Sequence, residues 1–326
     1  ETIAEEKEIE KNIDVHQGSE EVGAGASTLK KEVISEISET HTEIPSPRVI
    51  QTERPRGDLV PEALGSESFK RDYNLRYAYF SGSMYKAISS KELVVKMGQA
   101  GHLSFLGTGG VAIDEVEQHL VFIKDKLHHG EPFGANVLAN LSSPESEFEL
   151  VKMFMRLGVK YVEASAFMQV SPALVYYRLN SLERDQQGVV RSKNKLIAKL
   201  SRPEVASVFL RPAPERIVSR LLEDNLISAE QAEMSKEVSV ADDICVESDS
   251  GGHTDMGVIA TLLPAIMRQR DEICKEMGYQ QEVRVGAAGG IGTPESAASV
   301  FLMGADFIVT GSINQCTIEA GTSDQV

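Results

Sequence analysis

The sequence has no tryptophan, only three cysteines and no long hydrophobic run. Cys245, Cys274 and Cys316 are too few and too scattered for a disulfide framework or a zinc knuckle, which favours a reducing compartment. No stretch approaches the roughly 18 consecutive apolar residues that a membrane helix needs, and the opening ETIAEEKEIEK is unlike a signal peptide. We therefore expect a cytoplasmic protein without a membrane partner or a metal site.

Basic residues are also in the minority. The chain has 33 Lys and Arg against 49 Asp and Glu, a net charge of −16, and this charge opposes association with nucleic acid. Residues 1–43 hold 12 of the acids but only 4 of the bases, and the proline-containing stretches IPSPRV and ERPRG follow them. High charge with few apolar residues is typical of a solvated segment. We predict a disordered acidic linker over residues 1–60 and one folded domain over residues 61–326.

Short apolar runs alternate with helix-compatible segments after residue 74. Such alternation is typical of parallel strands joined by right-handed crossovers, and eight repeats in about 250 residues match the size of a (β/α)8 barrel. We therefore predict an α/β fold of the TIM-barrel type, with a doubly wound sheet as the alternative. The eight predicted strands are 76–80, 102–107, 133–139, 159–165, 194–201, 243–248, 283–289 and 306–311.

Helix boundaries carry local signals. Ser90, Asp114 and Ser143 stand where N-caps are expected, and Gly158 stands where a C-cap is expected. The connection between the fifth and sixth strands is longer than the others, and its stretch 214–225, PERIVSRLLEDN, is amphipathic. We predict an enlarged helical crossover that either packs on the barrel wall or covers the active rim.

Glycines cluster after the last two predicted strands. GAAGGIGTPES follows the seventh strand and TGSINQC follows the eighth. In a (β/α)8 barrel these loops and a helix N-terminus form the usual phosphate site, because glycine amides can approach the oxygens closely. Glycines also serve tight turns, so that alternative stays open. We predict that Gly289, Gly290, Gly311 and Ser312 hold the phosphate of a cofactor or substrate.

Polar side chains interrupt three of the apolar strands: Asn136 in FGANVLAN, Glu163 in VKYVEAS and Lys199 in LIAKLS. A buried lysine is costly unless it meets an anion, which favours a functional role for Lys199. An ion pair between Lys199 and Glu163 would need no ligand, and Asn136 could be a hydrogen-bonded core amide. A histidine, His253, follows the sixth strand in SGGHTD, where it either faces a ligand or merely follows a turn.

These motifs together resemble a known group of enzymes. They are similar to the trans-acting enoyl reductases of bacterial polyketide and polyunsaturated fatty acid synthases, a branch of the nitronate monooxygenase-like flavin barrels. The resemblance extends over residues 74–326 and lies in MGQAGHLSFLGTGG, FGANVLAN, IAKLSRPEVA, ADDICVESDSGGHTD, GAAGGI and TGSINQCTIEAGTSD. It implies an enzyme that binds FMN, takes hydride from NADPH and reduces the double bond of an enoyl thioester on an acyl carrier protein.

The resemblance also implies roles for single residues. The FMN phosphate would lie on the glycine loops, and Lys199 would stabilise negative charge on the reduced ring. His253 would be catalytic, either as a hydrogen-bond donor to the thioester oxygen or as the proton donor. The residues 108–110 would border the flavin. The implied cofactor-binding residues are Asn136, Lys199, Asp249, Gly252, Gly289, Gly290, Gly311 and Ser312.

Partners follow from the same resemblance. Besides the carrier protein, we expect modules of a polyketide or fatty acid synthase and an acyltransferase fused upstream of the acidic linker. Members of the group continue past the barrel, whereas this chain ends 15 residues after Gly311, so we expect a domain truncated at its C-terminus. The basic stretch 191–202 either contacts the carrier protein or NADPH, or is a solvated loop.

Three other functions stay open. A nitronate monooxygenase would use the same barrel and FMN with oxygen as the acceptor. A nucleotide dehydrogenase of the inosinate type would use Cys316 as a nucleophile, although that cysteine could equally be a small buried apolar residue. A flavin-free barrel could serve as a scaffold or docking module of a synthase.

Overall fold

The computed structural model describes residues 60–140, 142–250 and 255–323. The predicted linker over residues 1–60 therefore lies outside the described residues, apart from Val60. Gly252 and His253 lie outside them as well. None of the described helices is long and apolar enough to cross a membrane.

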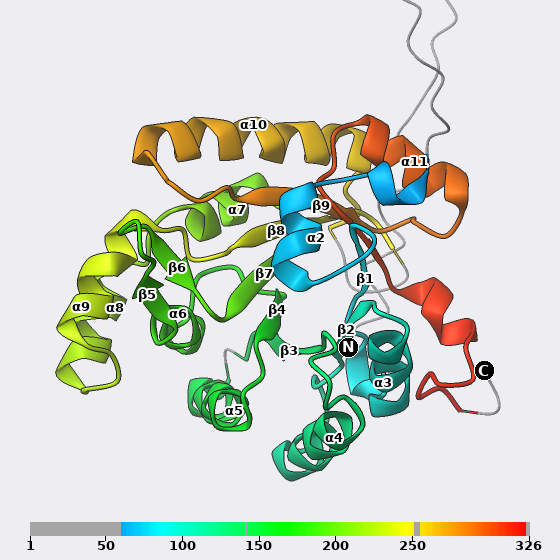
Figure 1. Ribbon diagram of the computed structural model, residues 1–326, viewed down its shortest axis with the longest axis horizontal. Coiled ribbons are helices and arrows are strands. Elements are labelled where there is room, and N and C mark those ends of the chain that lie inside the picture. Colours follow the sequence, from blue (N-terminus) through cyan, green and yellow to red (C-terminus); the bar gives the residue numbers. More distant parts are fainter. Residues whose placement is uncertain (1–59, 141, 251–254, 324–326) are drawn as a thin grey trace, which may run out of the picture. The chain divides into compact units, whose positions relative to one another are not determined.

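A closed barrel of eight parallel strands forms the centre of the fold (Figure 1). The first and last strands close it by pairing Tyr79 with Ile308 and Ser81 with Thr310. Each of the eight predicted strands overlaps one observed strand, so the TIM-barrel prediction is confirmed and the doubly wound sheet is excluded. The strands are β1 (Tyr79–Ser81), β2 (Leu103–Leu106), β3 (Gly134–Leu138), β4 (Tyr161–Ser165), β7 (Lys195–Leu200), β8 (Asp243–Glu247), β9 (Arg284–Ala288) and β10 (Ile308–Thr310).

Helices surround the barrel and bury their apolar faces against the outer sides of the strands. The Ser90 hydroxyl caps α3 by accepting from the Leu93 amide, and Gly158 ends α5 with a φ of 69°, as predicted. Asp114 is not an N-cap, because α4 begins one residue earlier, and the Ser143 side chain makes no capping hydrogen bond. The helices are α3 (Lys91–Gln99), α4 (Ile113–Lys126), α5 (Pro144–Leu157), α6 (Pro172–Leu179), α7 (Pro203–Leu210), α10 (Ile259–Met277) and α11 (Pro294–Leu302).

The connection from β7 to β8 is enlarged, as predicted. After α7 it contains α8 (Glu215–Glu223) and α9 (Ala229–Met234), which lie at one side of the barrel near α6 (Figure 1). Val218 and Leu221 of α8 are buried. Among the described residues, none of α8 or α9 lines the cavity on the rim. The crossover therefore packs on the wall and does not form a lid.

Two elements were not anticipated. A short antiparallel hairpin, β5 (Leu182–Arg184) with β6 (Val190–Ser192), stands between α6 and β7. A helix before the barrel, α2 (Glu67–Tyr73), is seen in Figure 1. Its Phe69 and Tyr73 pack against aromatic residues of the barrel interior. Both elements are short, so they depend on the surrounding fold as well as on their own hydrogen bonds, such as the Ser66 cap of α2.

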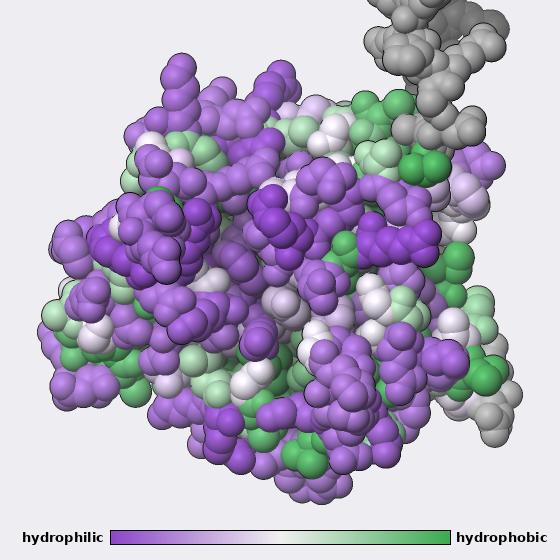
Figure 2. Space-filling view, viewed as in Figure 1, coloured by the Kyte–Doolittle hydropathy of each residue, from purple (hydrophilic) through white to green (hydrophobic). Residues whose placement is uncertain are grey.

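The amino-terminal end of the barrel is closed by buried charges beneath α2. The hydroxyl of Tyr73 donates to Asp243 at 2.5 Å, and Arg284 pairs with the same carboxylate. Polar side chains cover most of the face seen in Figure 2, with apolar patches scattered among them. Because buried side chains fill the amino-terminal end of the barrel, a binding site is expected at the loops that follow the carboxyl ends of the strands.

Candidate active site

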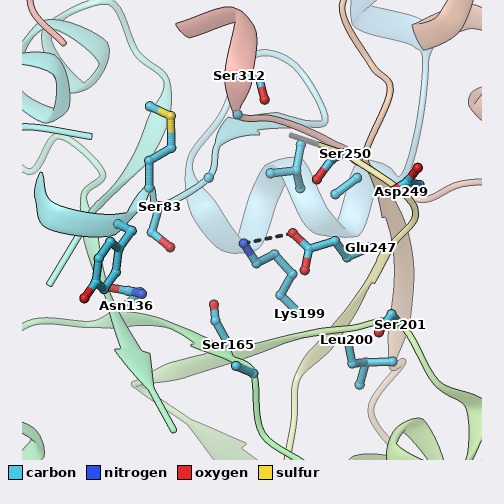
Figure 3. A pocket seen from close by; sticks show the side chains of 18 of the residues that line it. Ser83, Asn136, Ser165, Lys199, Leu200, Ser201, Glu247, Asp249, Ser250 and Ser312 are labelled. Carbon is cyan, nitrogen blue, oxygen red and sulfur yellow. Dashed lines mark ion pairs between the residues drawn. The ribbon is translucent and has the colours of Figure 1, made fainter. Parts of the chain in front are cut away.

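A cavity of about 1310 Å³ lies at the carboxyl ends of the strands, and residues at or just after the end of every barrel strand line it (Figure 3). Its volume exceeds the range of a few hundred to about 1,000 Å³ that holds one drug-sized ligand, so two ligands could share it. Seven of the predicted site residues line it: Asn136, Lys199, Asp249, Gly289, Gly290, Gly311 and Ser312. The fold therefore brings together residues spread over 177 positions of the chain.

Lys199 lines the cavity and lies between the carboxylates of Glu163 and Glu247; its ion pair with Glu247 is drawn in Figure 3. Its ammonium group is 3.2 Å from an oxygen of Glu163 and 3.2 Å from an oxygen of Glu247. Burial opposes the charge on Lys199, but the two carboxylates outweigh burial and raise the pKa of the ammonium group above its ordinary value. The ion pair with Glu163 that needs no ligand is thus present, and Lys199 is not an isolated cation awaiting an anion.

Glu163 has no exposed surface, and both of its carboxylate oxygens are bonded. Ser83 donates to it twice, with its hydroxyl at 2.6 Å and its backbone amide at 3.2 Å, and Ser165 donates its hydroxyl at 3.0 Å. A buried carboxylate with this many donors is rigid. The network fixes both Lys199 and the loop that begins at Ser83. These serines could not be singled out from the sequence, because serines are common after strands and carry no distinguishing pattern.

Asn136 is a hydrogen-bonded core amide that also reaches the cavity. Its side-chain oxygen accepts from the amide of Thr108 at 2.7 Å and from the Thr108 hydroxyl at 3.0 Å. Because the oxygen is committed to the protein, a ligand would meet the amide nitrogen as a donor. Of the three residues predicted to border the flavin, only Gly109 lines the cavity, whereas Thr108 orients Asn136.

The glycine loops after β9 and β10 line the cavity. Gly289 has a φ of +89°, and a Cβ there would lie 2.5 Å from the Ser248 carbonyl oxygen, so only glycine fits. Gly290 and Gly311 have no heavy atom within 4 Å of a Cβ position. The helix α11 starts next to this space, capped by the Thr293 hydroxyl. Glycine loops with free space beside a helix N-terminus suit an anion, and these residues therefore fit the phosphate of FMN.

Asn314 anchors the loop after β10, although nothing in the sequence singles it out. Its side-chain nitrogen donates to the Ser81 hydroxyl at 2.8 Å and to the Thr310 carbonyl oxygen at 3.2 Å. These bonds join the ends of β1 and β10 beneath Gly311 and Ser312. Cys316 follows in the same segment but is exposed and does not line the cavity. It is neither the buried apolar residue considered above nor placed as a nucleophile.

Asp255 ties the loop after β8 to the loop after β7. Its carboxylate accepts from the guanidinium of Arg202 at 2.9 Å and also from the hydroxyl of Ser201. These hydrogen bonds hold the pKa of Asp255 well below its usual range. Asp255, Arg202 and Ser201 all line the cavity. The two described ends of the SGGHTD segment, Ser250 and Asp255, therefore belong to the site.

The basic stretch 191–202 does not form a free cationic patch. Besides Lys199 and Arg202, its other three cations each contact a carboxylate in the structure. The pairs are Arg191 with Asp185, Lys193 with Glu183 and Lys195 with Asp242. The structure therefore offers no support for this stretch as a binding site for a carrier protein or for NADPH.

Parts of two proteins of polyketide and polyunsaturated fatty acid biosynthesis are similar in sequence to this chain. The chain is 52% identical over 268 residues to the polyketide biosynthesis protein PksE of Bacillus subtilis, which is 82% of this chain and 35% of that protein. It is 44% identical over 265 residues to one of the subunits of the polyunsaturated fatty acid synthase of Thraustochytrium, 81% of this chain and 13% of that protein. The chain thus spans about a third or less of the length of these two relatives.

Solved structures show the same fold. The enoyl reductase domain of MlnA, from the macrolactin biosynthesis cluster of Bacillus amyloliquefaciens, superimposes with a TM-score of 0.79 at 46% identity, over 81% of this chain and 60% of that one. FabK of Thermotoga maritima matches with a TM-score of 0.54 at 20% identity, over 78% of this chain and 64% of that one. The second likeness bears on the fold alone.

The resemblance to enoyl reductases of polyketide and polyunsaturated fatty acid synthases, predicted from the motifs, is confirmed by these relatives. The model of a protein family described as nitronate monooxygenase matches residues 68–326, which include the whole barrel. The chain therefore belongs to the nitronate monooxygenase family.

Proposed function

We propose that this chain is an FMN-dependent enoyl reductase domain that uses NADPH to saturate the α,β double bond of an enoyl thioester on an acyl carrier protein. The observation that carries the proposal is the cavity that gathers seven of the predicted cofactor residues at the rim of the barrel. Membership of the family implies a flavin. The MlnA domain, named as an enoyl reductase, supports the reduction of an enoyl group. The relatives from polyketide and polyunsaturated fatty acid biosynthesis support a role within such a synthase.

The residues present would hold FMN in a defined way. The backbone amides of the lining residues Gly290, Gly311 and Ser312, with the start of α11, would bind the phosphate. Asn136 would donate its amide nitrogen to the ring, since its oxygen is already bonded to Thr108. Bound FMN would supply hydride transfer from NADPH to the β-carbon of the enoyl thioester.

The chain's own residues would stabilise the negative charge that forms on the substrate and supply the proton that the reaction needs. Addition of hydride places negative charge on the thioester oxygen, and a proton must then reach the α-carbon. We assign one of these two roles to His253: it either donates a hydrogen bond to the thioester oxygen or donates the proton to the α-carbon. Lys199 contributes a cation whose position is fixed by Glu163 and Glu247. Because those carboxylates compensate its charge, Lys199 would act mainly by donating hydrogen bonds from a rigid position.

An experiment with the purified chain separates the candidate functions. The chain is reconstituted with FMN, reduced with NADPH without oxygen, and mixed with crotonyl thioester. We expect a flavin absorption band, its loss with NADPH, its return with crotonyl thioester, and butyryl thioester as the product. A chain that stays colourless after reconstitution would be a scaffold. Reduction of the oxidised flavin by a nitronate, followed by reoxidation with oxygen and no reduction of crotonyl thioester, would indicate a nitronate monooxygenase.

A further inference from the structure

Apolar side chains line the cavity across from the glycine loops, and Ile291 and Ile313 also lie on the loops themselves. Leu138 ends β3 and Met168 follows β4, whereas the glycine loops follow β9 and β10. In the closed order of the barrel, β3 stands across from β9 and β4 across from β10. The apolar side chains therefore face the side that suits the phosphate. A ligand held on the amides would leave Leu138 and Met168 for an apolar group.

Tyr85 completes the apolar side. It lies in the loop after β1, lines the cavity and is 56% exposed, so its ring is not part of the protein's own core. The ring rests on Gly109 and Gly110. A Cβ at Gly110 would lie 2.6 Å from the Tyr85 ring, and a Cβ at Gly109 would lie 2.9 Å from Leu138 and 3.1 Å from Tyr85. Tyr85 and Leu138 thus both contact the space above Gly109, and a Cβ at either glycine would displace the Tyr85 ring.

The backbone that presents Tyr85 is strained. The next two residues, Lys86 and Ala87, both have a φ of +52°, which non-glycine residues rarely adopt. Hydrogen bonds hold this conformation: the Lys86 amide donates to the Gly109 carbonyl at 2.8 Å and the Ile88 amide donates to the Tyr85 carbonyl at 3.2 Å. Strain of this kind is kept where it places a functional group, because otherwise a relaxed loop would replace it.

We propose that Tyr85 is a specificity-determining residue whose ring, with Leu138, packs against the acyl chain of the enoyl thioester. The proposal rests on the proposed function. We call the surface formed by Tyr85 and Leu138 the acyl wall, and the proposal names the acyl chain as the part of the substrate that it contacts. The ring offers a flat apolar surface, so its contribution grows with the length of the acyl chain. A four-carbon crotonyl group would gain little from the wall, and a twelve-carbon dodecenoyl group would gain most.

Steady-state kinetics test the proposal in the FMN-loaded chain. Tyr85→Ala should raise KM for dodecenoyl thioester about tenfold, with a change below about twofold for crotonyl thioester and for the rate of flavin reduction by NADPH. Tyr85→Phe should behave as the unaltered chain, because the ring and not the hydroxyl makes the contact. An equal change for both thioesters, or none, would overturn the proposal.

A binding measurement tests the same wall without turnover. The sequence has no tryptophan, so Tyr85→Trp introduces the single tryptophan of the chain. Saturated dodecanoyl thioester should change its fluorescence with a saturable dependence on concentration. The same ligand should leave Tyr77→Trp unchanged, because Tyr77 precedes β1 at the opposite end of the barrel. If crotonyl thioester is never reduced, the proposed function fails, and an unresponsive Tyr85→Trp would separately overturn the acyl wall.

Discussion

The ammonium group of Lys199 lies 3.2 Å from a carboxylate oxygen of Glu163, a side chain with no exposed surface. The second carboxylate, Glu247, is equally close but keeps 24% of its side chain exposed. The cluster therefore holds two carboxylates and one ammonium group, and of the two carboxylates only Glu247 is partly solvated. A buried charge that loses its partner is costly, and this asymmetry can be measured.

Replacement of Glu163 should destabilise the fold more than replacement of Glu247. Glu163→Gln removes the buried partner of Lys199 and should lower the free energy of unfolding by about 3 kcal/mol. Glu247→Gln, the matched control, removes a partly exposed partner and should cost about 1 kcal/mol. Urea unfolding at neutral pH measures both. Equal losses would mean that the burial of Glu163 has no energetic consequence.

Gly290 should be required for the cofactor and not for the fold. Gly290→Ala places a Cβ in the open space beside the amides, and its φ of +67° adds about 1 kcal/mol of backbone strain. Gly278 is the matched control, because its φ is +66° and no heavy atom lies within 4 Å of a Cβ there, yet it ends α10 away from the cavity. Titration with FMN should show weaker binding for Gly290→Ala alone. Equal affinity of the two variants would place the phosphate elsewhere.

Glu147 should make stability depend on pH. This side chain of α5 accepts a hydrogen bond from Ser171 at the start of α6, and burial raises its pKa above the ordinary 4.5. The folded protein therefore binds the proton more tightly than the unfolded chain, so the stabilisation is complete below the unfolded pKa and is lost as pH rises through the folded pKa.

The neutral variant Glu147→Gln has no proton to lose. Its advantage in free energy of unfolding over the unaltered chain should grow as pH rises from 4.5 towards neutrality and then level off. Urea unfolding at several pH values in this range measures the difference. A difference that is constant with pH would show that Glu147 titrates alike in both states.

His253 should act on the substrate and not on the cofactor. His253→Ala should keep FMN and its reduction by NADPH, while reoxidation by crotonyl thioester slows by about 100-fold. His129→Ala, at an exposed histidine between α4 and β3, is the control. Stopped-flow absorbance separates the two half-reactions. Recovery in His253→Gln would assign charge stabilisation, since an amide donates a hydrogen bond but delivers no proton; unchanged reoxidation in His253→Ala would remove His253 from the mechanism.

Several site residues could be predicted because their local sequence is unusual. Lys199 and Asn136 interrupt apolar strands, and Gly290 and Gly311 follow strands in a barrel whose rim is known to bind phosphate. Tyr85 could not be predicted in this way. Its loop has no glycine at the two positions with positive φ that would mark it as unusual. The glycines that the Tyr85 ring contacts, Gly109 and Gly110, lie in a different loop, after β2.

The charges show the same limit. From the sequence, the stretch 191–202 reads as basic, because the acids that pair with its cations lie outside it. Asp242 and Asp255 reach Lys195 and Arg202 only when β7 and β8 pair in the barrel. A local count of charge therefore overestimates the cationic surface that remains after folding.

The sequence by itself determined the order of strands and helices, the barrel and the position of the glycine loops at its rim, because hydrophobic periodicity and glycine placement act over a few residues. Only the tertiary structure decided that Glu163 and Glu247 compensate Lys199, that α2 fills one end of the barrel, and that Tyr85 faces the cavity. Those relationships join residues far apart in the chain, and they depend on barrel closure and on the register of the strands, which no short segment specifies.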